Sequence, residues 1–231
     1  MATYVVGDTH GCLQSLRFLL EHRIGISRSD TVILLGDLVD RGPRSAQLID
    51  YILLLQDQGF NILSIRGNHD QMLLDAANSR AHYTQWLQNG GISTLRSYED
   101  FMGESFLFPE GIPSIHTSFL NQLPYHLAID RFMLVHGGIN PYHDNPLNDT
   151  ESLLWGRMGE LPNDFMPNTI FLYGHIPTPL ASIQEIVNKS EHRLIPLDGG
   201  CVYAGLHPGV GYLVALELET MKLYWVDRQE D

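Results

Sequence analysis

The sequence has very few lysines, only two cysteines and no long apolar run, and each shortage narrows what the protein can be. Lys189 and Lys222 are the only lysines, and 14 basic residues face 27 acidic ones, which gives a net charge of −13 with neutral histidines. Broad nucleic-acid binders present a basic face to phosphates, so we expect no stable nucleic-acid partner. No run approaches the ~20 apolar residues that span a bilayer, and we see no signal-peptide pattern. We therefore expect no membrane association and a cytoplasmic location.

The two cysteines, Cys12 and Cys201, lie far apart in the chain, and neither has a neighbouring cysteine. This spacing indicates neither a metal-binding nor a redox pair, and we expect a protein without disulfides. Repeats, low-complexity segments and Pro/Gly-rich linkers are also lacking. With 44% hydrophobic and 18% charged residues, the composition favours a single globular domain over 1–231. Residues 72–122 read as helical and irregular and are the candidate for a helical cap inserted into that domain.

The first 70 residues alternate between apolar runs typical of buried strands and segments with helical spacing. We predict strands at 4–6, 31–35 and 61–65, with helices at 13–23 and 45–58 between them. This order indicates right-handed βαβ units and a mainly parallel sheet, in which the loops after the strands meet at one edge. Further strands are predicted in the second half, at 126–129, 132–135, 170–173, 181–186, 211–218 and 222–226.

Polar loops rich in Asp, His and Gly follow five of these strands. They are Gly7 to Gly11, Gly36 to Gly42, Arg66 to Asp70, His136 to Gly138, and Gly174 with His175. Asp8 and His10, one residue apart, can chelate one cation where the turn is tight, and Asp37 can bridge two cations. The oxygen and nitrogen donors suit Mn, Fe, Zn or Mg and lack the thiolates of a structural zinc site. Five such loops are difficult to explain as independent turns.

Together, in this order from residue 8 to 175, the loops resemble those of the calcineurin-like metallophosphoesterases. Within that group they most resemble the compact bacterial and phage members of the phosphoprotein phosphatase family. The resemblance implies an α/β fold, a four-layer αββα sandwich with two central mixed β-sheets. It also implies two divalent metal ions as cofactors, with manganese the first expectation and Fe, Zn or Mg as alternatives.

The resemblance further implies a role for particular residues. One metal is expected on Asp8, His10 and Asp37, and the second on Asp37, Asn68, His136 and His175. The expected catalytic residues are His69, its orienting carboxylate Asp40, and two phosphate-binding arginines, Arg41 and Arg157; Asn68 is also expected near the substrate phosphate. Arg66 is a weaker candidate for the site, and Asp70 is not expected to bind metal. The implied reaction is an in-line attack on phosphate by a hydroxide that the two metals activate.

Three functions are compatible with these residues. The leading expectation is a serine/threonine protein phosphatase whose partner is a phosphorylated protein or peptide, and no regulatory subunit can be inferred. The alternative is a symmetrical dinucleoside-polyphosphate (diadenosine tetraphosphate) hydrolase, because those enzymes resemble the chain in the same loops. They typically have Ala where this chain has Asp40, and an acid-supported His69 suits a poor alkoxide leaving group, which favours the protein phosphatase. A non-catalytic scaffold of the same fold is the third, least favoured, since His69 and all six expected ligands are present.

Overall fold

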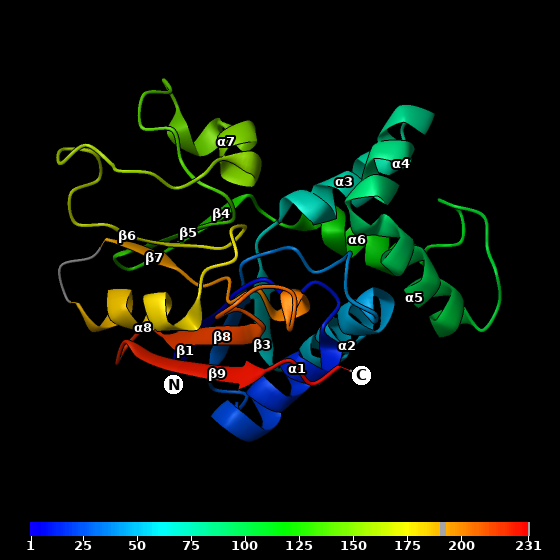
Figure 1. Cartoon of the computed structure of the whole chain (residues 1–231), viewed down its shortest axis with the longest axis horizontal. Coiled ribbons are helices and arrows are strands. Elements are labelled where there is room, and N and C mark those ends of the chain that lie inside the picture. The colour runs from blue at the N-terminus through cyan, green and yellow to red at the C-terminus, as the bar shows by residue number, and fades with distance from the viewer. Residues whose placement is uncertain (190–192, 231) are drawn as a thin grey trace.

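The computed structural model describes residues 1–189 and 193–230, in which two β-sheets lie face to face with helices outside them (Figure 1). The first sheet has the strand order β3-β2-β1-β8-β9 and the second the order β4-β5-β6-β7. The strands of the first sheet are β1 (Thr3–Val6), β2 (Thr31–Leu34), β3 (Asn61–Ser64), β8 (Tyr212–Glu217) and β9 (Lys222–Asp227). Those of the second are β4 (His126–Ile129), β5 (Phe132–Val135), β6 (Ile170–Tyr173) and β7 (Leu194–Pro196). The mixed α/β fold with two mixed sheets agrees with the sequence analysis.

Parallel pairing places the loops that follow the strands at one edge of each sheet. β1 pairs in parallel with β2, and β2 with β3, while β8 and β9 are antiparallel additions. In the second sheet β5, β6 and β7 are parallel and β4 is antiparallel. The parallel edge predicted for the first three loops is thus confirmed, and a second parallel set supplies more loops.

Three apolar layers hold the sheets and helices together. Val5, Ile33 and Leu35 of the first sheet face Leu134 and Leu172 of the second in the layer between the sheets. The outer face of the first sheet packs against α1 (Leu13–Arg17), its continuation η1 (Phe18–Ile24), and α2 (Ser45–Asp57). The outer face of the second sheet is covered by α7 (Thr150–Trp155) and the chain around it. Burial of these apolar side chains is the main stabilising contribution to the fold.

A helical segment, residues 68–122, leaves the first sheet after β3 and leads to β4 of the second sheet. It contains α3 (Asn68–Ala76), α4 (Arg80–Trp86), η2 (Leu87–Gly91), α5 (Ile92–Met102) and α6 (Ser114–Gln122). In Figure 1 helices α3 to α6 gather on one side of the molecule, and α7 lies on the opposite side. The segment begins four residues before the predicted cap, because the polar loop after β3 is itself the start of α3. Its Trp86, Tyr98 and Leu120 belong to the same buried cluster as α1 and α2.

The strand predicted at 181–186 is wrong, because the structure has helix α8 (Leu180–Asn188) there. Leu180, Ile183 and Val187 recur at helical spacing, and all three pack against the layer between the sheets. A short apolar stretch can match both the two-residue period of a strand and the 3.6-residue period of a helix. Pro179, immediately before Leu180, is typical of a helix start. Among the residues that the structure describes, no helix is long and apolar enough to cross a bilayer.

Candidate active site

Six strand ends bring polar residues together where the parallel edges of the two sheets meet. From the first sheet come Asp8 and His10 after β1, Asp37 and Asp40 after β2, and Asn68 and His69 at the start of α3 after β3. The second sheet contributes His136 after β5, His175 after β6 and Asp198 after β7. Apart from the partly buried His175, all these side chains are buried.

Two of the histidines are oriented by backbone carbonyls. The Nδ1 of His10 lies 2.9 Å from the carbonyl of Val39, and the Nδ1 of His136 lies 2.8 Å from the carbonyl of Leu35. Because a carbonyl only accepts, each Nδ1 donates its hydrogen, and in the neutral ring the lone pair is on Nε2. Metal-binding histidines are commonly oriented in this way by their second nitrogen.

Asp37 lies between two groups of possible metal ligands. Within each group, donor atoms of three residues lie within 4.8 Å of one another, and the groups are His10, Asp37 and His69, and Asp37, His136 and His175. The Nε2 atoms of His10 and His136 are each 3.4 Å from a different oxygen of Asp37. The Oδ1 of Asn68 is a further possible metal-ligand atom, 2.9 Å from both His136 Nε2 and His175 Nδ1. A carboxylate that belongs to two groups of possible ligand atoms suits a site that holds two metal ions.

Asp8 has an unsatisfied oxygen in this site. Its Oδ2 accepts from the backbone N–H of His175 at 2.9 Å, but its buried Oδ1 has no hydrogen-bond partner. Burial and the nearby Asp198 raise the pKa of Asp8 well above its usual range. An orphaned buried carboxylate oxygen costs free energy unless a cation or donor meets it. The residues present therefore fit divalent metal ions, although Asp8 is outside both groups of three.

The buried acids and histidines of the site shift one another's pKa values. Burial raises the pKa of Asp37, but His136, His69 and His10 outweigh it and hold that pKa well below its usual range. Burial lowers the pKa of His136, and Asp37 and Asp8 outweigh this and raise it to about 10. Burial lowers the pKa of His10 to about 3. His10 is thus neutral, as a metal ligand must be, whereas His136 carries beside Asp37 and Asp8 a proton that a bound cation would replace.

The backbone is strained at the same residues. Among the described residues, eight non-glycine residues have positive φ, and five belong to this site: His10 (43°), Asp37 (50°), Asp40 (72°), Arg41 (69°) and His175 (70°). Each such conformation costs ~1–3 kcal/mol and persists where the surrounding structure imposes it, which is typical of functional sites. The loops also approach closely, since a Cβ on Gly174 would collide with Asp8 Oδ1 and one on Gly67 with Asp37.

His69 is held by Asp40, and Asp40 is held by the helical segment. The Nδ1 of His69 is 2.8 Å from Asp40 Oδ2, and its ring lies edge-on to that of His10 with centroids 4.9 Å apart. Asp40 also accepts from Trp86 Nε1 at 2.9 and 3.0 Å and from Thr94 Oγ1 at 2.7 Å. Burial raises the pKa of Asp40 to about 8 and lowers that of His69 to about 4. The sequence motifs name His69 and Asp40 but give no sign of Trp86 or Thr94.

The three arginines considered in the sequence lie in different places. Arg41 reaches the site, with Nη1 2.7 Å from His10 Nε2. Arg157 has an exposed side chain without a hydrogen bond or ion pair to the described residues, while its backbone lies against Gly138, so its phosphate-binding role stays a prediction. Arg66 does not face the site, because its guanidinium donates to Gln71, Tyr125 and the carbonyl of Asn121. It ties the start of the helical segment to the chain before β4.

Two further acids support the loops. Asp70 accepts from the backbone N–H groups of Leu38 and Gly67, both at 2.9 Å, and so joins the second loop to the third. Asp198 is buried, accepts from Gly200 N at 2.8 Å, and lies close enough to Asp8 to raise its pKa. In the sequence Asp198 follows a stretch typical of a strand and has two interpretations, a simple turn or a residue of the site, of which the turn is favoured. The structure has it at the site, after the parallel strand β7.

Cys12 and Cys201 meet in the fold although they are far apart in the sequence. Both are free and buried, and with Glu230 they form a third group of donor atoms within 4.8 Å. Contact with Cys201 and burial raise the pKa of Cys12 far above its usual range. Both belong to the buried apolar cluster that includes α1 and α2, so this pair packs as part of the core.

Comparison with known proteins identifies the family. A model of the calcineurin-like phosphoesterase family matches residues 1–206, and the chain belongs to that family. A curated relative, the symmetrical bis(5'-nucleosyl)-tetraphosphatase of Ectopseudomonas mendocina (strain ymp), is 35% identical over 141 residues, which are 61% of this chain and 46% of the relative. The chain spans about half the length of the curated relatives it matches. The family implies a dinuclear divalent metal site, and the two groups around Asp37 are the candidates for its ligands.

Solved structures with different activities share the fold. A protein proposed to be a diadenosine tetraphosphatase superposes with a TM-score of 0.63 at 21% identity, covering 100% of this chain and 95% of that one. A protein serine/threonine phosphatase from Saccharomyces cerevisiae also gives 0.63, at 14% identity, covering 100% and 80%. At these identities the likeness shows the fold alone, and the fold does not separate the two substrates.

The expected serine/threonine protein phosphatase is overturned by the curated relatives, which are named symmetrical bis(5'-nucleosyl)-tetraphosphatases. The Asp40–His69 pair on which that expectation depended is present at 2.8 Å. The inference from the pair to the substrate was wrong, because a histidine held by a carboxylate can exchange a proton with any leaving oxygen. The pair therefore describes the reaction centre and leaves the choice of substrate to its surroundings.

Proposed function

We propose that this protein hydrolyses dinucleoside tetraphosphates symmetrically, giving two nucleoside diphosphates. The observation that carries the proposal is the shared name of the curated relatives, at 32 to 35% identity over 141 to 184 residues. In this reaction water attacks one of the two central phosphorus atoms, and the anhydride bond between the central phosphates breaks. Two divalent cations, when bound, supply Lewis acidity to the water and the phosphate.

The residues of the chain support this reaction in distinct roles. Asp37, flanked by His10 and His136 at 3.4 Å, is placed to hold both cations. Arg41, beside His10, is placed to bind non-bridging phosphate oxygens with its guanidinium. The Nδ1 of His69 is engaged by Asp40, which leaves its Nε2 to exchange a proton with the departing diphosphate.

A product analysis tests the proposal. The purified protein with added manganese is given diadenosine tetraphosphate or a phosphothreonine peptide, and products are separated by chromatography. We expect ADP as the only nucleotide product and a higher kcat/KM for the dinucleotide. AMP with ATP would exclude symmetrical cleavage, and faster hydrolysis of the peptide would overturn the proposal. The Asp37→Asn variant, purified in parallel, controls for contaminating phosphatases.

A further inference from the structure

A pocket of about 550 Å³ lies beside the metal-site loops, between the loop after β2, the helical segment and the chain after β9. We propose that it holds one nucleoside diphosphate half of the dinucleotide, an inference that rests on the proposed function. The lining residues that matter are Arg41, Arg96, Arg228, Asp100, Leu87 and Ile92. Its volume lies within the ~300–1,000 Å³ typical of small-ligand pockets.

Arg41 connects this pocket to the reaction centre. Its Nη1 is 2.7 Å from His10 Nε2, and Arg41 also lines the pocket. The backbone N–H of Arg41 donates to the carbonyl of Gly90 at 3.3 Å, and a Cβ on Gly90 would approach Arg41 Cγ to 2.8 Å. This close packing fixes the pocket wall against the loop after β2. A phosphate chain that begins at the metal ligands can therefore continue past Arg41 into the pocket.

The charge of the pocket is opposite to that of the protein. Arg41, Arg96 and Arg228 outnumber Asp100, in a chain whose net charge is −13. Arg96 is exposed and makes no hydrogen bond or ion pair with the described residues. The Nε of Arg228 is buried without a hydrogen bond and forms a long ion pair with Glu230, with Nε and Oε2 3.9 Å apart. Arg41 and Arg96 form no ion pair with an acid of the described residues and are available to phosphate oxygens.

The pocket also offers apolar surface for a base. Leu87 and Ile92 line it beside the arginines, and Ile92 is 48% exposed. A purine presents a flat apolar face, whereas inorganic phosphate or a phosphopeptide main chain does not. Cationic and aliphatic side chains in one pocket match the two ends of a nucleoside diphosphate.

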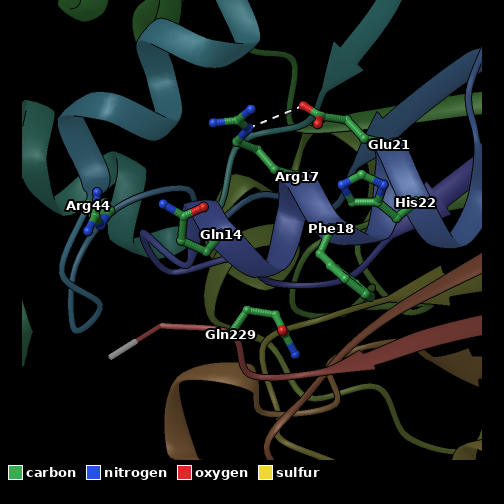
Figure 2. A pocket seen from close by; sticks show the side chains of 7 residues that line it. All are labelled: Gln14, Arg17, Phe18, Glu21, His22, Arg44 and Gln229. Carbon is green, nitrogen blue, oxygen red and sulfur yellow. Dashed lines mark hydrogen bonds and ion pairs between the residues drawn. The ribbon is translucent and has the colours of Figure 1, made fainter.

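A second pocket provides the contrast. Figure 2 shows its lining, in which the side chain of Arg17 on α1 points toward Glu21 on η1, and the two form an ion pair with Nε and Oε1 3.2 Å apart. This pocket, of about 370 Å³, is lined by none of the predicted catalytic or metal residues. Its arginine Arg17 is therefore a matched surface control for Arg96.

The test compares Arg96→Gln with Arg17→Gln on two substrates, diadenosine tetraphosphate and p-nitrophenyl phosphate, which has no second half. For each variant we take the ratio of two kcat/KM values, the dinucleotide over the aryl phosphate. In Arg96→Gln this ratio should fall ~10-fold or more, because a charge-assisted contact to the dinucleotide is lost. The ratio should stay within about twofold in Arg17→Gln, whose arginine contacts no phosphate. An unchanged ratio in Arg96→Gln, or equal falls in both variants, would overturn the pocket proposal.

A binding measurement separates this proposal from the proposed function. ADP is added as an inhibitor of p-nitrophenyl phosphate hydrolysis by the native protein and by Arg96→Gln. We expect the variant to need ~10-fold more ADP for the same inhibition. If the native protein does not hydrolyse the dinucleotide yet shows this difference, the proposed function fails while the nucleotide pocket stands. Equal inhibition of both proteins would overturn the pocket.

Discussion

The strand-end loops and the helical segment meet at Asp40 and contribute to the site in different ways. The loops carry the expected ligands, with short spacings and glycines that allow close approach, as at Gly67 and Gly174. The helical segment supplies Trp86 and Thr94, whose side chains donate to Asp40. One region provides the reacting groups, and the other fixes one of them in place.

This difference shows which functional residues a local sequence pattern can identify. A ligand needs a particular residue type at a particular turn, so its signal is short and recognisable. A supporting donor needs only to reach its partner through space, and Trp86 lies 46 residues from Asp40. Side chains of the same helical segment line the proposed nucleotide pocket. In our interpretation the part of this segment that has no recognisable motif therefore determines the substrate preference.

The largest effect is expected in the loops, at Asp37. Asp37→Asn removes the charge shared by the two ligand groups, and loss of a buried charge of this kind costs ~4 kcal/mol, or about 1,000-fold in turnover. Metal analysis after dialysis should show that both ions are depleted. Retention of two ions per chain would show that Asp37 does not bridge them.

His69→Asn should have a smaller effect and a different signature. Without the proton donor held by Asp40, turnover should fall ~100-fold or more. Both metals should remain, since Asp37, His10 and His136 are unchanged. Metal analysis and steady-state kinetics check this prediction. Loss of metal in the variant would show that His69 is itself a metal ligand, a role that its position near His10 and Asp37 also allows.

Trp86→Phe tests the contribution of the helical segment itself. The substitution keeps an aromatic ring in the buried site but removes the N–H that Asp40 accepts. We expect kcat to fall ~10-fold with both metals retained, because a lost hydrogen bond to a carboxylate costs ~1.5–3 kcal/mol. Trp225→Phe, on β9 away from Asp40, is the matched control. Equal kcat values for the two variants would show that Trp86 does not support catalysis through Asp40.

The smallest effect concerns stability of the helical segment with pH. Burial lowers the pKa of His116 from 6.5, and its ring lies near Tyr98 and Asp50. Below pH 6.5 the unfolded chain therefore binds a proton that the folded protein lacks, so stability falls as the pH drops toward the folded pKa. Urea unfolding at pH 7.5 and 5.5 should show a smaller loss for His116→Gln than for the native protein. Equal losses would contradict this contribution.

Much of the fold could be predicted from period and turn chemistry. The strands β1, β2 and β3 alternate with helices in the expected order, and their parallel pairing follows from the handedness of βαβ units. The error at α8 arose because the predicted strand, 181–186, is too short for its period to separate a strand from a helix, although Leu180, Ile183 and Val187 together have helical spacing. Their packing between the sheets selects the helix, and that information is not local.

For the site, the sequence by itself predicted which polar residues follow the strands, and the resemblance to the metallophosphoesterases gave them their expected roles, including Asp37 as a shared ligand. Parallel strands bring their following loops to one edge, so a local pattern could place these residues together. Only the tertiary structure decided that Arg66 faces away and that Trp86 and Thr94 hold Asp40. Those facts depend on side chains distant in sequence packing together, which a local pattern cannot specify.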